Sequence, residues 1–104
     1  MPRTYGESFL RELNATQDKT AGVRLARVCV ETNLPAAYVA KALEVSITTI
    51  HHWFRNRKGI NDKHKKMIDV FISLAKQDLG TGRLPATSTK DAKTYIEEMI
   101  GRSI

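Results

Sequence analysis

Several protein classes require features that this chain has little of or lacks. It contains a single cysteine, so no internal disulfide can form and nothing indicates an oxidising compartment. No apolar run approaches the roughly 20 residues that a helix needs to cross a bilayer. The first ten residues lack the apolar segment of a signal peptide. We therefore expect a cytoplasmic protein that is not associated with a membrane.

Patterns typical of enzymes and metal sites are also missing. A chain of 104 residues forms one domain with a modest core, which leaves no room for a large catalytic scaffold. No Ser/His/Asp arrangement, glycine-rich phosphate loop or inward pair of carboxylates suggests catalysis. The adjacent His51 and His52, with His64 farther on, do not have the spacing of zinc ligands. We expect neither an enzyme nor a protein that uses a metal or another cofactor.

The apolar residues recur at helical spacing, and no segment alternates as a half-buried strand does, so the predicted fold class is all-α. Caps and breakers place the helices along the chain. The predicted helices are a short one around Phe9 and Leu13, then 20–31, 35–43, 47–57 and 62–79, and a last one from residue 90 to about residue 100. We expect Gly59 to end the helix that begins at residue 47, and Gly80 to end the next one.

The predicted architecture is a compact helix-turn-helix domain of four to five helices at 1–79, with its core at 20–79, and an additional C-terminal helix. Glycine, proline, serine and threonine mark residues 80–89 as a flexible linker. The C-terminal segment, 90–104, has an apolar side that includes Tyr95, and an isolated helix of this length is marginal in water. Two alternatives stay open: this helix docks on its own domain, or it dimerises with a second copy.

Residues 36–58 carry the clearest functional pattern. Two helices joined by a three-residue turn, with small Ala40 in the first and apolar Val45 in the turn, have the spacing of a helix-turn-helix. In the second helix we expect an inward apolar side and an outward side that is polar and basic. The inward residues are Ile47, Ile50, Trp53 and Phe54, and the outward ones are Thr48, His52 and Arg55. Such a helix can contact base edges and phosphates in the major groove of DNA.

The positive charge of the chain is concentrated next to this pattern. The chain has 17 Lys and Arg, 11 Asp and Glu, and a net charge of +6. Residues 51–66 hold six basic side chains and one acidic side chain, which accounts for +5 of that total. Basic side chains beside a helix that fits the major groove favour a nucleic acid as the acidic partner.

A resemblance to a known family lies in residues 34–50, above all in the run VAKALEVSITTI at 39–50. This segment is similar to the helix-turn-helix of the lambda repressor and Cro type, also called the xenobiotic-response-element family, and with its flanking helices the resemblance covers about 20–79. It implies a sequence-specific transcriptional regulator that binds double-stranded DNA. The small helical make-up also resembles regulators from bacteriophages. Two residues depart from the family pattern: Ala36 replaces a glutamine that braces a phosphate, and Glu44 replaces the glycine of the turn, which requires a strained or reshaped turn.

The resemblance implies different roles for the second helix and for the segment after it. Base reading in the major groove is assigned to helix 47–57 and its N-cap, through Ser46, Ile47, Thr48, His51, His52 and Arg55. We expect phosphate binding by Thr49, Asn56, Arg57, Lys58, Lys63, Lys65 and Lys66. One helix-turn-helix reads only a few base pairs, so we also expect a homodimer, formed through the C-terminal helix or through residues 71–79.

Other interpretations keep the same helices. Residues 53–58, WFRNRK, are similar to the recognition helix of homeodomains, which would assign base reading to His52, Arg55 and Asn56. Homeodomains continue this helix as a basic arm, and Gly59 with the amphipathic helix after it contradicts that. Two further functions stay open: a protein-interaction module that binds a host factor, and the DNA-targeting subunit of a recombination or packaging machine.

Overall fold

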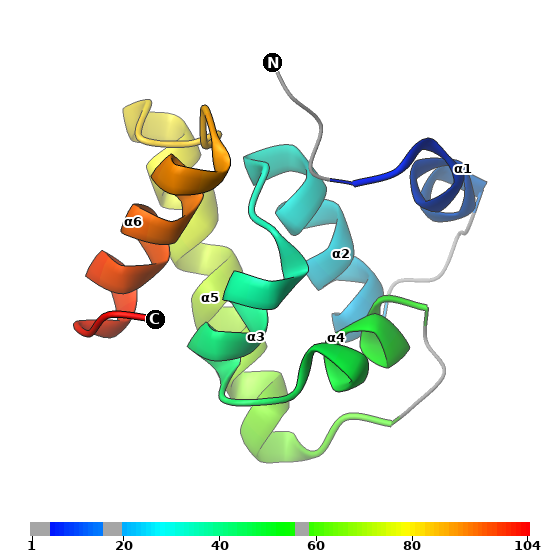
Figure 1. The fold of residues 1–104 in the computed structure, drawn as a ribbon. Coiled ribbons are helices and arrows are strands. Elements are labelled where there is room, and N and C mark those ends of the chain that lie inside the picture. Colours follow the sequence, from blue (N-terminus) through cyan, green and yellow to red (C-terminus); the bar gives the residue numbers. More distant parts are fainter. Residues whose placement is uncertain (1–4, 16–19, 56–58) are drawn as a thin grey trace.

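A computed structural model describes residues 5–15, 20–55 and 59–104 of the chain, and this part is all-α, as predicted (Figure 1). It measures 30 × 29 × 24 Å along its principal axes. The helices of the described part are α1 (Glu7–Ala15), α2 (Ala21–Thr32), α3 (Ala36–Leu43), α4 (Ile47–Phe54), α5 (Asp62–Thr81) and α6 (Thr89–Ile100).

Helix α2 lies at the centre of the arrangement and packs against α1, α4 and α5 (Figure 1). Thr20, predicted as the first residue of this helix, is its N-cap: its Oγ1 accepts a hydrogen bond from Val23 N at 3.4 Å. Asn33 ends it in the left-handed conformation, with φ 57°. Cys29 is fully buried in α2, and burial raises the pKa of its thiol to about 12. This cysteine therefore serves as a small apolar core residue.

Helix α4 packs onto α2 at unusually close range. Its residues Ile50, Trp53 and Phe54 are buried, as predicted. At Gly22 of α2, an added Cβ would lie 2.2 Å from the carbonyl oxygen of Trp53. The Trp53 ring also lies 5.4 Å from the ring of His64 in α5, measured between ring centres. Trp53 thus contacts both α2 and α5 from α4. Only glycine fits at position 22, and no sequence pattern indicated this requirement.

Two predicted helix ends differ from the structure. Helix α4 ends at Phe54, with Arg55 as its C-cap, and not at residue 57. The N–H of Arg55 donates to the carbonyl of His51 at 3.2 Å, and residues 56 and 57 of the predicted helix lie outside the described residues. Helix α5 runs through Gly80 and ends at Thr81, because Gly82 takes the left-handed conformation, with φ 87°.

The segment between α5 and α6 is packed against the end of α2, which differs from the flexible linker expected at 80–89. Leu84 and Ala86 within it are buried. The Ala86 N–H donates to the carbonyl of Thr32 at 2.9 Å, and the side-chain amide of Asn33 donates to the carbonyl of Ala86 at 2.8 Å. The connection is held in place because its buried backbone groups find partners on α2 and its C-cap.

Helix α6 docks on its own domain, where it lies against α3. Ser88 caps it, since its hydroxyl accepts a hydrogen bond from Asp91 N at 3.1 Å. Tyr95 and Ile96 are buried, and the Tyr95 hydroxyl donates to the carboxylate of Asp78 on α5. Of the two alternatives for residues 90–104, the structure shows docking on the same chain.

Replacing Gly22 by alanine tests the close approach of α2 and α4. The added Cβ would meet the Trp53 backbone at 2.2 Å, and backbone atoms cannot rotate away as a side chain does. We expect the free energy of unfolding, measured by urea titration, to fall by about 1–3 kcal/mol. The control is Gly80→Ala: this glycine lies inside α5 with no atom within 4 Å of the added Cβ, so helix propensity should raise stability by up to about 1 kcal/mol. Equal effects of the two changes would contradict this packing.

Candidate nucleic-acid interface

The turn between α3 and α4 fixes how these helices meet. Glu44 has φ 59° and ψ 42°, the left-handed conformation that favours glycine, so the strain expected at this residue is present. Two backbone hydrogen bonds close the turn, from Glu44 N to Lys41 O at 3.3 Å and from Val45 N to Ala40 O at 3.0 Å. Val45 is half-buried and packs against the core. The two helices therefore have one fixed arrangement relative to each other.

Ser46 and Thr49 hold the start of α4. The Ser46 hydroxyl accepts a hydrogen bond from Thr49 N at 3.1 Å, and the two hydroxyls are hydrogen-bonded to each other at 2.9 Å. The sequence assigns Ser46 to a base and Thr49 to a phosphate. A hydrogen bond from either hydroxyl to DNA would therefore have to form alongside the hydrogen bonds of this cap.

The outward side of α4 presents predicted base-reading residues to solvent. Thr48 and His52 are exposed, as expected. The sequence placed Ile47 both on the inward side of this helix and among the base-reading residues. The inward placement is wrong, because the Ile47 side chain is 46% exposed. Ile47 is the first residue of α4, and burial begins one turn later at Ile50. The first turns of this helix therefore expose an apolar, a hydroxyl and an imidazole group together.

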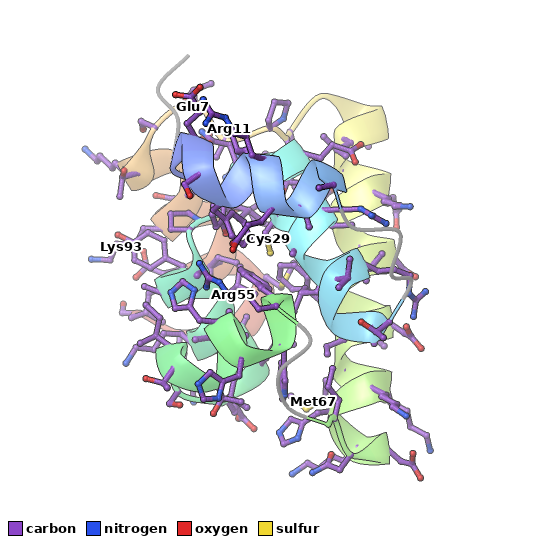
Figure 2. The ribbon with its side chains drawn as sticks, turned by 90° about the vertical axis from the view of Figure 1, so that its right-hand side faces the viewer. Glu7, Arg11, Cys29, Arg55, Met67 and Lys93 are labelled. Atoms are coloured by element: carbon purple, nitrogen blue, oxygen red, sulfur yellow. The ribbon has the colours of Figure 1, made fainter. Side chains whose placement is uncertain are left out.

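Arg55 is held by helix α1, which lies next to α4 in Figure 2. Its Nε lies 3.5 Å from Oε2 of Glu12, and its guanidinium lies 5.4 Å from the centre of the Phe9 ring. Helix α1 is anchored by the rings of Tyr5, Phe9 and Phe54, whose centres are between 5.4 and 6.3 Å apart. Sequence reasoning missed Glu12, whose only signal is its helical spacing from Phe9 on one side of α1. A DNA contact by Arg55 would compete with this carboxylate.

His51 stands between the exposed and buried sides of α4. It is half-buried, with its ring centre 6.1 Å from that of Phe54. Burial, and then the positive charges of Arg55 and His52, lower the pKa of His51 below its ordinary value. This shift favours the neutral imidazole, which can both donate and accept a hydrogen bond.

The lysines predicted to bind phosphate lie at the start of α5. Asn61 caps this helix by accepting a hydrogen bond from His64 N at 2.9 Å, and the contact of His64 with Trp53 places this end of α5 against α4. The exposed lysines there are Lys63, Lys65 and Lys66. The other predicted phosphate ligands, Asn56, Arg57 and Lys58, lie outside the described residues.

These lysines do not form one continuous patch. At 100° per residue they point in different directions around α5. Lys66 borders an apolar groove together with Val70. Lys65 shares a side of the helix with Asp69, whose carboxylate lies 3.2 Å from Arg24 of α2. The positive charge therefore surrounds the start of α5, and part of it is offset by an acidic neighbour.

No three histidine, cysteine or carboxylate side chains of the described residues gather in a group that could hold a metal ion. No helix in this part of the chain is long and apolar enough to cross a membrane. Comparison with protein-family models, with curated proteins and with solved structures gave no match. The interpretation of the α4 surface therefore depends on its own residues.

Proposed function

We propose that the chain is a sequence-specific transcriptional regulator that binds double-stranded DNA through the exposed side of α4. The observation that carries the proposal is a fixed three-residue turn followed by a helix that buries an apolar side and exposes Thr48 and His52. An α-helix fits the major groove, where such side chains can reach base edges. The resemblance to the lambda repressor and Cro family supports a transcriptional regulator, and the small helical make-up supports one encoded by a bacteriophage, acting in the cytoplasm without catalysis or a cofactor.

The charge of the chain supports the same proposal. A net charge of +6 attracts the phosphate backbone independently of sequence. The lysines at the start of α5 lie next to the end of α4, so they can bind phosphates that flank the bases read by this helix. Arg55 joins them when it exchanges the Glu12 carboxylate for a phosphate or a base.

We also propose that the protein acts as a homodimer through its α5 and α6 side. An apolar groove of about 370 Å³ lies between α3, α5 and α6. On its α5 wall, Val70 and Leu74 are 59% and 40% exposed, and Met99 and Ile100 of α6 line it as well. A second copy would remove this apolar surface from water. Two copies of α4 related by a two-fold axis would read twice as many base pairs.

Fluorescence anisotropy with duplex DNA at several salt concentrations tests the DNA-binding proposal. Thr48→Ala and His52→Ala should change the preference between sequences, each by about 1–3 kcal/mol, because base contacts carry specificity. Lys63→Gln and Lys65→Gln should weaken binding to all duplexes alike and lower the salt slope by about 1. The control is Lys90→Gln, an exposed lysine in the first turn of α6. Figure 1 shows that the start of α6 lies at the opposite end of the molecule from the start of α5. Absence of duplex binding at every salt concentration would contradict the proposal and favour a module that binds a host protein.

Replacing Glu12 by glutamine tests whether Arg55 is available to DNA. The change removes the carboxylate 3.5 Å from Arg55 Nε and frees the guanidinium. We expect duplex affinity to rise about two- to fivefold, the size of one exposed ion pair. Glu7→Gln is the matched control, since Glu7 lies on the same helix, pairs with Arg11 at 2.7 Å and carries the same charge. An equal gain in both variants would show that only net charge matters and that Arg55 has no special role.

Light scattering at roughly tens of micromolar protein tests the homodimer. The wild-type chain should have the mass of a dimer. Val70→Glu places a carboxylate on the wall of the apolar groove and should give a monomer, because burying a charge in an apolar interface is costly. Lys76→Glu places a carboxylate at an exposed position on another side of α5 and should stay dimeric. A monomeric wild-type chain would refute dimerisation in the absence of DNA.

A further inference from the structure

The exposed side of α4 borders a hollow of about 350 Å³ whose walls are mostly apolar. Ile47, His51 and Arg55, which follow one another at four-residue spacing, form its α4 side. Tyr5 and Phe9, from α1 and the residues before it, form another side with their rings. Figure 2 shows Arg55 between α1 and α4. The hollow therefore lies along the part of α4 that we propose to read DNA.

The N-cap and first turn of α3 contribute apolar side chains to this hollow. Pro35, Ala36 and Ala37 line it there, so none of these side chains offers a hydrogen bond. Ile47 lies at the same hollow with 46% of its side chain exposed. A single exposed isoleucine is common on protein surfaces. Ile47 differs from such cases because it adjoins an apolar hollow on the side of α4 that we propose to face DNA. An apolar group of the DNA would therefore fit against it.

The major groove of DNA presents one apolar group among its polar edges, the 5-methyl group of thymine. We propose that Ile47 and Ala37 receive this methyl group from one thymine per bound copy of the chain. The inference rests on the proposed DNA-binding function and adds to it a preference for thymine. Beside Ile47 and Ala37 a phosphate would lose hydration and find no side-chain donor, since His51 and Arg55 lie one and two turns farther along α4. A methyl group gains there by leaving water.

Replacing thymine by deoxyuridine removes this methyl group and leaves the hydrogen-bonding edges of the base pair unchanged. The full chain is first used to select its preferred duplex from an unmodified random-sequence pool, in which thymine carries the only methyl group of the major groove. Each thymine of the selected site is then replaced in turn, and affinity is measured by fluorescence anisotropy. At one thymine per bound copy, we expect binding to weaken about fourfold, which corresponds to roughly 0.8 kcal/mol for one buried methyl group.

Ile47→Ala shows whether Ile47 is the partner of that methyl group. At the sensitive position, this variant should bind the thymine and deoxyuridine duplexes with affinities within about twofold of each other. A general loss of affinity or stability does not affect this result, because the two duplexes are compared with the same variant. The control is Val30→Ala, which truncates a partly exposed apolar side chain of α2 outside both the hollow and the apolar groove, and it should keep the wild-type difference.

Three outcomes would overturn the inference and leave the proposed DNA-binding function intact. These are a selected site without thymine, equal wild-type binding to thymine and deoxyuridine at every position, and an unchanged difference in Ile47→Ala. Failure to select any sequence from the pool would overturn both the inference and the proposed sequence-specific function.

Discussion

The close approach of α2 to α4 at Gly22 is the constraint on which the exposed surface of α4 depends. With the Trp53 carbonyl seated against Gly22, the apolar side of α4 faces the core. Helical geometry then turns Thr48 and His52 away from the core. The left-handed residue Glu44 completes the arrangement, because it lets α3 and α4 meet through a turn of only three residues. The absence of a side chain at Gly22 thus sets which residues of α4 are exposed to a ligand.

Two surfaces of different chemistry result from this packing. The surface beside α4 combines polar side chains, Ile47 and the restrained Arg55, while the groove between α3, α5 and α6 is apolar. Helix α1 belongs to the first surface, since Phe9 and Glu12 hold Arg55. Helix α6 belongs to the second, because it docks on α3 and leaves Val70 exposed. A regulator that binds DNA with one surface and a second copy with the other would use both.

Features with local signals could be predicted from the sequence, and features that depend on distant partners could not. Ser46 and Ser88 mark helix starts because each caps a backbone N–H three residues ahead. The exposure of Thr48 followed from the helical period alone. Gly22 gives no such signal, since glycine is required there only because α4 packs against it. The candidate site shows the same limit, because the ion pair that restrains Arg55 involves a helix far away in the sequence.

The central claim is that DNA binds to the exposed side of α4. Backbone amide shifts of the ¹⁵N-labelled full chain, followed by NMR during titration with duplex DNA, test this claim most directly. The account predicts that the largest changes occur at Ile47, Thr48, His52 and the start of α5, and that the apolar groove around Leu74 changes little once the protein is dimeric. Changes concentrated at that groove, or an absence of changes at α4, would contradict the account.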